Sequence, residues 1–592
     1  MCGICGELRF DASIPALATI ERMKEKLQKR GPDSEGAYIN APVAFGHRRL
    51  AIIDLSDKAA QPMLDEEAGI ALVFNGTIYN YPDLRKELIG LGHRFLSTGD
   101  TEVILRAYIQ WGDNCVARLQ GMFAFAIWDN KQQRLLLACD RTGIKPLYFS
   151  QTGKRFMFAS NTQALIHADK AIDTSIDAAA LHHLFTLHAV VPAPRTVVNG
   201  IRKVKPAHYM VIDAKGGVTE TRYWTLTAKR PDTKMSEQDW VQAVHDELRR
   251  AVEKRVKIAD VPVGVLLSGG IDSSLLVGLL AEAGQKDLKT FSVGFEDAPE
   301  EKGNEFEYSD AVAKMFATEH HQLMVPNNQV LPRLPEAFAN MAEPMFGQDA
   351  VAFYLLSEVV SQEVKVVQSG QGADEVFGGY FWYPRMHHSK KKGINRFSDE
   401  YFDRDHAEYL QTVDKRFHCH DVTSELMQDL LDEVEADEYL DRVMAVDVNT
   451  LIVDDPVKRV DNMTMAWGLE ARVPFLDTQL VELAASMPPE MKLPNGGKHV
   501  LKELSRGFLP DSVVNRSKAY FPMPALKYVR GEFLEFMKEI LLCDSAKQRG
   551  LYDSVYVEKL LKKPEDYQTR LQGSKLWHLA ALELWWQQNI EI

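Results

Sequence analysis

A nearly continuous apolar run at positions 263–267 ends abruptly in Ser268-Gly269-Gly270, and a second apolar run starts at Leu275. The β-branched residues of the first run favour a strand, and the second run is typical of a helix. Two glycines let the backbone turn sharply and approach a ligand. The amides of such a loop, together with the start of the helix, form an anion site. This pattern predicts a phosphate-binding loop at the mouth of a parallel sheet.

Hydroxyl and carboxylate side chains surround this loop. Ser268, Ser273 and Ser274 can donate hydrogen bonds to phosphate oxygens, and Asp272 offers a carboxylate that could hold Mg²⁺. The full combination on a buried strand is more typical of a pyrophosphate-binding loop than a lone Ser-Gly-Gly would be. A strand–helix turn without any ligand is the alternative.

Strand and helix patterns alternate in the C-terminal two-thirds, which predicts an α/β fold with a parallel sheet. Apolar runs at 288–295 and 364–368 are expected to be further strands. Each of the three strands ends in glycine and a polar residue. Ligands of open α/β sheets bind beyond the carboxyl ends of the strands, so we expect these ends to converge on one site.

The N-terminal third has frequent strand patterns, which suggest layered sheets with helices outside. Residues 71–74, 121–129 and 134–139 are predicted strands, and Asp100 is predicted to cap a helix that starts there. A second helix is expected from Ser236, its N-cap, to about Lys257. The polar and proline-containing sequence before it predicts a boundary, with domains over 1–215 and 236–592.

Composition narrows the function classes. The net charge of −14 argues against sequence-independent nucleic-acid binding, and no apolar run is long enough to predict a membrane span. We see no signal peptide, and six cysteines in 592 residues do not form a disulfide framework. We therefore expect a cytoplasmic protein that has small-molecule substrates and neither nucleic-acid nor membrane partners.

Cys2 is the most informative single residue. A small second residue usually allows Met1 to be removed, which would leave a thiol beside a free α-amino group with a pKa of ~8. An amine next to its own thiol can act as its general base, which is the logic of an N-terminal nucleophile. From this residue alone, an unremarkable second position remains the simpler interpretation.

Several motifs make the N-terminal third resemble the class II glutamine amidotransferase domain. These motifs are Met1-Cys2-Gly3-Ile4, Arg30-Gly31-Pro32-Asp33, His47-Arg48-Arg49-Leu50, Asn75-Gly76 and Gly99-Asp100. The resemblance implies an N-terminal-nucleophile fold, in which two antiparallel sheets lie between helices as an αββα sandwich.

The resemblance also implies a role for each matching position. Cys2 would attack the side-chain amide of glutamine, with Asn75 and the Gly76 N–H stabilising the oxyanion. Arg49 would pair with the glutamine α-carboxylate and Asp100 with its α-ammonium. The remaining glutamine-binding positions would be Leu50, Ile52, Ile53 and Thr77. The family usually has Glu at the position of Thr77, so a carboxylate contact is lost and glutamine binding is expected to be weaker.

The C-terminal two-thirds resemble the synthetase domain of glutamine-dependent asparagine synthetases, which belong to the pyrophosphatase-loop ATP family. Besides the loop, the matching strings are residues 461–466, 469–477 and 498–503, and Arg516-Ser517-Lys518 with Phe521-Pro522. The resemblance implies ATP and Mg²⁺ as cofactors. It also implies a homodimer, although no interface can be identified in the sequence.

Site residues of this domain follow from the same resemblance. Pyrophosphate would contact Ser268, Gly269, Gly270, Asp272, Ser273 and Ser274, while Leu266, Val293, Ser369 and Gly370 would frame adenine and ribose. Asp272 and Asp374 would hold Mg²⁺, and Lys498 would contact the α-phosphate. The alternatives are a helix cap for Asp374 and a surface helix position for Lys498. For Glu470 and Arg472 we expect a buried structural pair.

Two departures from the family concern the acceptor. Gln371 stands where the family has a carboxylate that is expected to deprotonate ammonia, and an amide cannot act as a base. The segment with Gln348 and Asp349 also differs from the usual Asp-Ser-Ser-Ala. The aromatic stretch from Tyr380 onward would suit an apolar or peptide-like acceptor better than aspartate, with core packing as the alternative.

These features together predict a ligase that adenylates a carboxylate, releases pyrophosphate and amidates the acceptor with ammonia from glutamine. The string at 188–195 and the departures are closer to a bacterial branch that amidates N-acetylglutaminylglutamine, an osmoprotectant precursor. Aspartate as acceptor, giving asparagine, is the alternative. A non-catalytic sensor of glutamine and nucleotide is an alternative of another class, and a ring-closing synthetase is disfavoured because Cys2 and its pocket are present.

Overall fold

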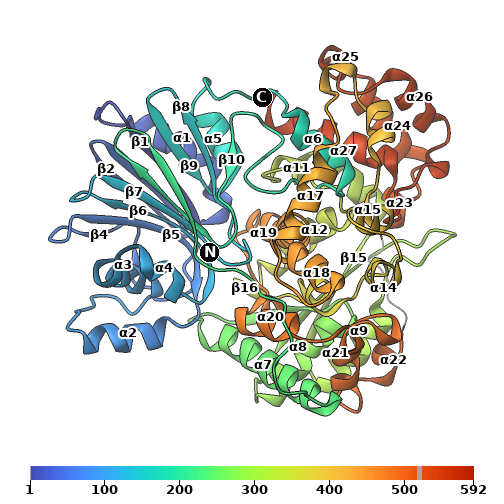
Figure 1. Ribbon diagram of the computed structural model, residues 1–592, viewed down its shortest axis with the longest axis horizontal. Helices are drawn as coiled ribbons and strands as arrows, with labels where there is room; N and C mark the ends of the chain where they lie inside the picture. The colour runs from blue at the N-terminus through green and yellow to red at the C-terminus, as the bar shows by residue number, and fades with distance from the viewer. Residues whose placement is uncertain (1, 517–522, 592) are drawn as a thin grey trace.

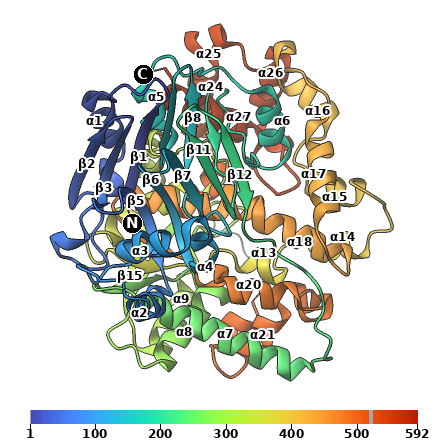
Figure 2. The same ribbon diagram turned by 60° about the vertical axis from the view of Figure 1, so that its left-hand side comes forward.

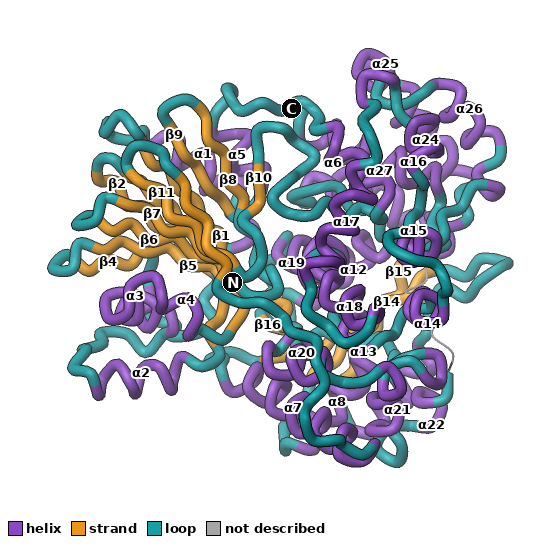
Figure 3. The backbone as a smooth tube through the Cα atoms, in the orientation of Figure 1, coloured by secondary structure: helices purple, strands orange, loops and turns teal. Residues whose placement is uncertain are grey.

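The computed structural model describes residues 2–516 and 523–591. Ser517, Lys518, Phe521 and Pro522 of the motif string, and Met1, lie outside the described residues. Strands gather in one lobe of the molecule, whereas helices make up most of the other (Figure 3). Figure 1 shows that the first lobe is N-terminal and that the second contains the rest of the chain.

The N-terminal domain contains two six-stranded antiparallel sheets, ordered β10-β8-β9-β1-β3-β2 and β12-β11-β7-β6-β5-β4. The strands of the first sheet are β1 Cys2–Arg9, β2 Ser34–Asn40, β3 Val43–Arg49, β8 Tyr148–Thr152, β9 Arg155–Ala159 and β10 Arg202–Lys203. Those of the second are β4 Met63–Asp65, β5 Ile70–Ile78, β6 Gly121–Asp129, β7 Arg134–Cys139, β11 His208–Asp213 and β12 Val218–Arg222.

Strand β6 explains how the layers pack. Alternate side chains of a strand point to opposite faces. Phe123 and Phe125 pack with the outer helices, while Ala124 and Trp128 pack between the two sheets. Both faces are therefore apolar, as the uninterrupted hydrophobic run requires. The helices outside the sheets are α1 Leu17–Lys26 and α5 Thr162–Ala168 on one side, and α2 Tyr81–Gly90 and α3 Asp100–Trp111 on the other. The αββα sandwich is confirmed.

The C-terminal domain is built on a five-stranded parallel sheet with the order β15-β14-β13-β16-β17. Its strands are β13 Val263–Leu266, β14 Lys289–Phe295, β15 Glu319–Val325, β16 Val366–Gln368 and β17 Glu470–Arg472. Val265 faces one apolar cluster and Leu266 the other, because both faces of the sheet are covered. The predicted parallel α/β fold is confirmed.

Helices cover both faces of this sheet and extend beyond it (Figure 2). The principal ones are α7 Glu237–Lys257, α8 Ile271–Glu282, α9 Phe306–Phe316, α12 Asp349–Val360, α13 Ala373–Phe377, α14 Trp382–His388, α18 Tyr439–Asn449, α19 Lys458–Met465, α20 Thr478–Ala485, α21 His499–Ser505, α24 Gly531–Leu542 and α27 Lys575–Asn589.

Helix α7 begins where the sequence predicts. The Ser236 hydroxyl accepts from the Asp239 N–H, and the Asp239 carboxylate accepts from the Ser236 N–H, which completes a capping box. Trp240, Val244 and Leu248 pack in the same cluster as Val265 of β13. The helix therefore supports the strand that leads into the glycine loop.

The two domains touch near the C-terminus. In helix α27, the Asn589 Oδ1 accepts from Gln163 Nε2 of α5 at 2.8 Å. The division at 1–215 and 236–592 stays a prediction, and β12 lies in the stretch between these ranges. All six cysteines are free. Within the described residues, no helix has the length and apolar character needed to cross a membrane.

Candidate functional site

A small cavity of about 30 Å³ lies at the start of β1 in the N-terminal domain. Residue Cys2 pairs with Arg49 of β3, so the thiol and the guanidinium emerge from neighbouring strands. The cavity brings together Cys2, Arg49, Leu50, Ile52, Ile53, Gly76, Thr77 and Asp100. These are eight of the residues that the sequence predicts for the glutamine site, drawn from segments nearly a hundred positions apart.

Asn75 is fully buried behind this cavity. Its Oδ1 accepts from the backbone nitrogen of Cys2 at 2.9 Å, while its Nδ2 makes no hydrogen bond with any described residue. A buried amide donor without a partner is costly unless a ligand satisfies it. At Gly76, a Cβ atom would lie 2.1 Å from the carbonyl oxygen of Met122, so only glycine fits there. This arrangement suits an oxyanion site.

The Cys2 thiol is nearly buried. Burial raises its pKa, although a backbone hydrogen bond from Leu50 and the charge of Arg49 oppose this effect. A thiol in this environment needs a nearby base before it can act as a nucleophile. The Cys2 nitrogen, which Asn75 holds, would become that base once Met1 is removed.

Asp100 does not cap helix α3, so this prediction is wrong. The N-cap is Gly99, and the Asp100 carboxylate accepts instead from the Ile78 N–H at the end of β5, at 3.0 Å. This contact draws the side chain into the cavity. Burial raises the pKa of Asp100 to about 6, although the hydrogen bond from Ile78 opposes the shift.

A residue of the C-terminal domain also lines this cavity. Glu470 of β17 is fully buried, and its Oε1 accepts from Thr77 Oγ1 at 3.3 Å and from Arg472 Nε at 2.6 Å. The expected buried pair of Glu470 and Arg472 is confirmed. That Glu470 also lines the Cys2 cavity could not be predicted, because the contact crosses between domains.

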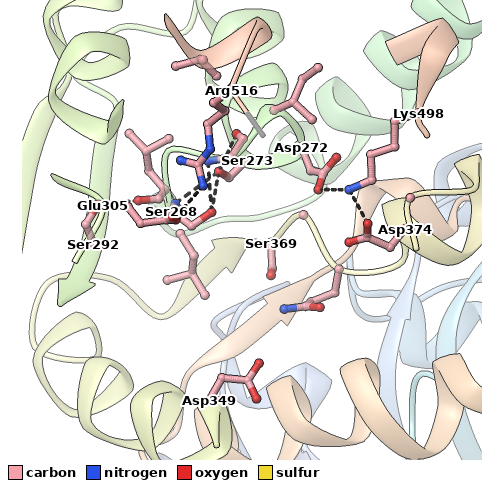
Figure 4. Close-up of a pocket in the computed structure, with 18 of the residues that line it drawn as sticks. Ser268, Asp272, Ser273, Ser292, Glu305, Asp349, Ser369, Asp374, Lys498 and Arg516 are labelled. Atoms are coloured by element: carbon pink, nitrogen blue, oxygen red, sulfur yellow. Dashed lines mark hydrogen bonds and ion pairs between the residues drawn. The ribbon is translucent and has the colours of Figure 1, made fainter. Parts of the chain in front are cut away.

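A larger cavity, of about 240 Å³, lies beyond the carboxyl ends of β13, β14 and β16 (Figure 4). The three strands are neighbours in the sheet, so their carboxyl ends meet at one site as predicted. The predicted residues that line the cavity are Leu266, Ser268, Gly270, Asp272, Ser273, Val293, Asp349, Ser369, Gly370, Gln371, Asp374 and Lys498.

The glycine loop is held by its own hydroxyl groups. Ser273 Oγ accepts from the Ser268 N–H at 3.2 Å, and Ser268 Oγ accepts from the Gly270 N–H at 3.4 Å. At Gly269, φ is +76°, and a Cβ atom would lie 2.7 Å from the Cβ of Tyr308. Both the backbone conformation and the close approach therefore demand glycine.

Two predicted phosphate contacts do not face this cavity. The fully buried Ser274 donates its hydroxyl hydrogen bond to the Gly270 carbonyl at 2.7 Å, so it supports the loop from behind. The Gly269 carbonyl accepts from Arg516 Nη1 at 3.2 Å. Neither residue lines the cavity.

Lys498 lies between two carboxylates (Figure 4). Its Nζ is 2.6 Å from Asp272 Oδ2 and 2.7 Å from Asp374 Oδ1. Although burial disfavours its charge, these carboxylates raise the pKa of Lys498 above its ordinary value. The alternative of a surface lysine is wrong, since Lys498 is 6% exposed. The alternative of a helix cap for Asp374 is also wrong, because the N-cap of α13 is Gly372.

Glu305 and Arg516 also line this larger cavity, which is the predicted nucleotide cavity. They form an ion pair beside the glycine loop, and burial raises the pKa of Glu305. No role was predicted for either residue from the sequence. Arg516 stands in a motif string, which is a usable signal, whereas Glu305 lies in a loop without any pattern.

Gln348 and Tyr380 line a second cavity, of about 170 Å³, beside the first. Asp349 lines both cavities, whereas Gln371 lines the nucleotide cavity but not the second one. The Asp349 Oδ1 is 3.0 Å from Arg459 Nη1. Burial raises the pKa of Asp349, while the charge of Arg459 opposes the shift. The predicted acceptor residues therefore divide between two adjoining spaces.

Comparison with known proteins agrees with this two-site architecture. Residues 243–587 match the asparagine synthase family, and residues 1–224 match the glutamine amidotransferase domain. Asparagine synthetase [glutamine-hydrolyzing] 1 of Bacillus subtilis is 31% identical, with 97% of this chain and 94% of that protein covered. Asparagine synthetase [glutamine-hydrolyzing] 3 of the same organism is 30% identical, with 99% and 98% covered.

The chain is also similar to a protein that is named an amidase and not an asparagine synthetase. Amidase chry2 of Gibberella zeae is 25% identical, with 90% of this chain and 89% of that protein covered. The matches to both family descriptions together span nearly all of the sequence. The larger cavity lies in the second matched region, and the Cys2 cavity is lined by residues of the first together with Glu470 of the second. The chain therefore belongs to the glutamine-hydrolysing asparagine synthetase family.

Proposed function

We propose that this glutamine-dependent carbon–nitrogen ligase amidates N-acetylglutaminylglutamine, using ATP and ammonia released from glutamine. The family membership establishes the ligase class and small-molecule substrates. The observation that carries the proposed acceptor is the second cavity. Its aromatic wall suits a peptide-like molecule.

In the first half of the proposed reaction, the Cys2 thiolate attacks the amide carbon of glutamine. The Asn75 amide and the Gly76 N–H stabilise the oxyanion, a contribution of about 3 kcal/mol per donor. Collapse of this intermediate expels ammonia and leaves a thioester on Cys2. Water then hydrolyses the thioester to glutamate and regenerates the thiol.

In the second half, an acceptor carboxylate oxygen attacks the α-phosphorus of ATP. Pyrophosphate leaves, and the glycine loop with Ser268 and Ser273 binds it. Lys498 stabilises the charge that develops on the phosphates. Asp272 and Asp374 would hold Mg²⁺, because both carboxylates already converge on one cation, the Lys498 ammonium. Bound Mg²⁺ would neutralise phosphate charge.

Ammonia then attacks the acyl carbon of the adenylate, and AMP leaves. The attacking nitrogen must lose a proton, and Gln371 cannot accept one. Asp349 lines both the nucleotide cavity and the acceptor cavity, so its carboxylate is suitably located to accept this proton. The raised pKa of Asp349 brings it closer to the operating pH of a general base.

The second cavity supports an acceptor larger than aspartate. Tyr380 and Trp382 stack with ring centroids 4.1 Å apart, and both line the cavity. The Trp382 Nε1 is buried and makes no hydrogen bond with a described residue. Arg459 and Lys527 also line the cavity, where Arg459 is paired with Asp349 and Asp455 and Lys527 with Glu301. Flat amide groups match the aromatic wall better than the compact aspartate zwitterion does.

We also propose a cytoplasmic location and a homodimer. Six free cysteines fit a reducing compartment. The homodimer follows from the family resemblance, and sedimentation equilibrium of the purified protein tests it directly.

Acceptor identity is tested by measuring pyrophosphate release from purified protein with ATP, glutamine and each candidate acceptor. We expect release to depend on N-acetylglutaminylglutamine and to remain near background with aspartate. Robust release with aspartate would contradict the dipeptide assignment. A non-catalytic sensor would release neither glutamate nor pyrophosphate under any of these conditions.

A further inference from the structure

The geometry points to Glu470, a residue of the synthetase domain, as the carboxylate that binds the α-ammonium group of glutamine. This inference rests on the proposed glutaminase function of the Cys2 cavity. It assigns a substrate contact across the domain boundary and explains how this chain tolerates threonine at position 77.

Glu470 lies where a replacement carboxylate would be needed. It lines the same cavity as Cys2 and Asp100, and its Oε1 lies 3.3 Å from Thr77 Oγ1. The family usually provides a carboxylate from position 77 itself. In this chain the shorter Thr77 side chain reaches Glu470, so the negative charge comes from the facing domain.

The charge of Glu470 suits this role. Burial favours its neutral form, yet the charge of the N-terminal amino group and then those of Arg472 and Lys145 lower the pKa of Glu470 below its ordinary value. Asp100, in contrast, has a pKa of about 6 and is partly neutral at weakly acidic pH. Glu470 is therefore the more reliable anion for an ammonium group.

A carboxylate such as Glu470 can bind several donors at once. An ionised carboxylate offers about four lone-pair positions, and Thr77 and Arg472 use two of them at Oε1. Across the cavity, Arg49 provides the opposite charge for the α-carboxylate. Glutamine bound between Arg49 and Glu470 would present its side-chain amide to Cys2.

This placement links the two active sites through one short segment. Glu470 and Arg472 belong to β17, and the Arg472 carbonyl accepts from the Ser369 N–H at 2.9 Å. Ser369 lines the nucleotide cavity. A single hydrogen-bonded strand edge therefore connects the proposed glutamine contact to the nucleotide site.

The test compares glutamine with its analogue that lacks the α-amino group, 5-amino-5-oxopentanoate. Glutaminase kcat/KM is measured for both substrates in the wild type, in Glu470→Gln and in Glu470→Gln with Thr77→Glu. We expect Glu470→Gln to lower the preference for glutamine over the analogue by roughly ten- to a hundredfold, as for a lost charged hydrogen bond. The added Thr77→Glu should restore much of this preference.

The urea midpoint of unfolding of each variant serves as the folding control, because it reports the folded state without using either active site. If Glu470→Gln lowers kcat/KM for both substrates by the same factor, Glu470 has only a structural role and the inference is wrong. If the wild type itself shows no glutaminase activity, the proposed function fails instead. The two failures are therefore distinguishable.

Discussion

At the scale of single residues, the proposed chemistry is divided between Cys2 and Lys498, which lie in different cavities. Replacing Cys2 with alanine removes the nucleophile but leaves every residue of the nucleotide cavity in place. We expect Cys2→Ala to lose glutamine-dependent synthesis by at least about a thousandfold and to retain synthesis from ammonium salts. Product formation with each nitrogen source measures this. Loss of both activities would contradict the separation of the two sites.

The pKa of Asp100 gives a pH prediction. Burial raises this pKa to about 6, so below that pH the carboxylate is protonated and no longer adds its negative charge to that of Glu470 near the ammonium group. We expect glutaminase kcat/KM to rise with pH through about 6 and then to level off. Asp100→Asn should lower kcat/KM and remove this rise. An unchanged acidic limb in the variant would assign the titration to another group.

Sequence alone identified Cys2, Arg49 and Asp100, because each stands in a short motif with a chemical reason for its residue type. It could not identify Glu470 or Glu305 as cavity residues. Both reach their cavities through tertiary contacts that no local spacing encodes. The predicted cap at Asp100 was wrong because the end of β5 offers its side chain a competing N–H.

At the scale of elements, the unit of β13, glycine loop and α8 depends on Gly269. We expect Gly269→Ala to weaken ATP binding by about tenfold or more, since a Cβ would meet the backbone of Ser309 at 2.8 Å and φ is positive. Gly507→Ala is the matched control, because φ is +71° there but nothing lies within 4 Å of the added Cβ. Isothermal titration calorimetry compares the ATP affinities of the two variants. Equal affinities in the two variants would exclude a role for the close approach.

The sequence predicted the central strands β13, β14 and β16 but not the two edge strands. β17 has only three residues, too few for a periodic pattern to emerge. β15 carries Glu319, His320, His321 and Gln322, and its outer edge pairs with none of the described strands, so it needs no continuous apolar run. Burial by helices on both faces, which makes the central strands recognisable, is weaker at this edge.

At the scale of the whole molecule, a buried charge cluster joins the domains. Asp461 of α19 accepts from Arg30 Nη1 at 3.0 Å and from Lys145 Nζ at 3.1 Å, and all three side chains are buried. Removing the negative charge would leave Arg30 and Lys145 buried without the carboxylate that pairs with both of them. Breaking a buried ion pair in this way typically lowers the free energy of unfolding by about 3–5 kcal/mol.

We therefore expect Asp461→Asn to lower the urea midpoint of unfolding strongly. It should also reduce glutamine-dependent synthesis more than ammonia-dependent synthesis, because the domain contact is disturbed. The control is Lys365→Gln, which breaks an ion pair with Asp33 across the same domains at an exposed position, and which should cost at most about 1 kcal/mol. Equal effects of both variants would show that the buried cluster has no special role.

The central claim is that nitrogen passes from glutamine at one site to an activated carboxylate at the other. The most direct test supplies amide-¹⁵N glutamine, ATP and N-acetylglutaminylglutamine together with an excess of unlabelled ammonium, and measures ¹⁵N in the product by mass spectrometry. Our account predicts a labelled amide, with AMP and pyrophosphate formed in equal amounts to it. An unlabelled product, or release of pyrophosphate without amide formation, would contradict it.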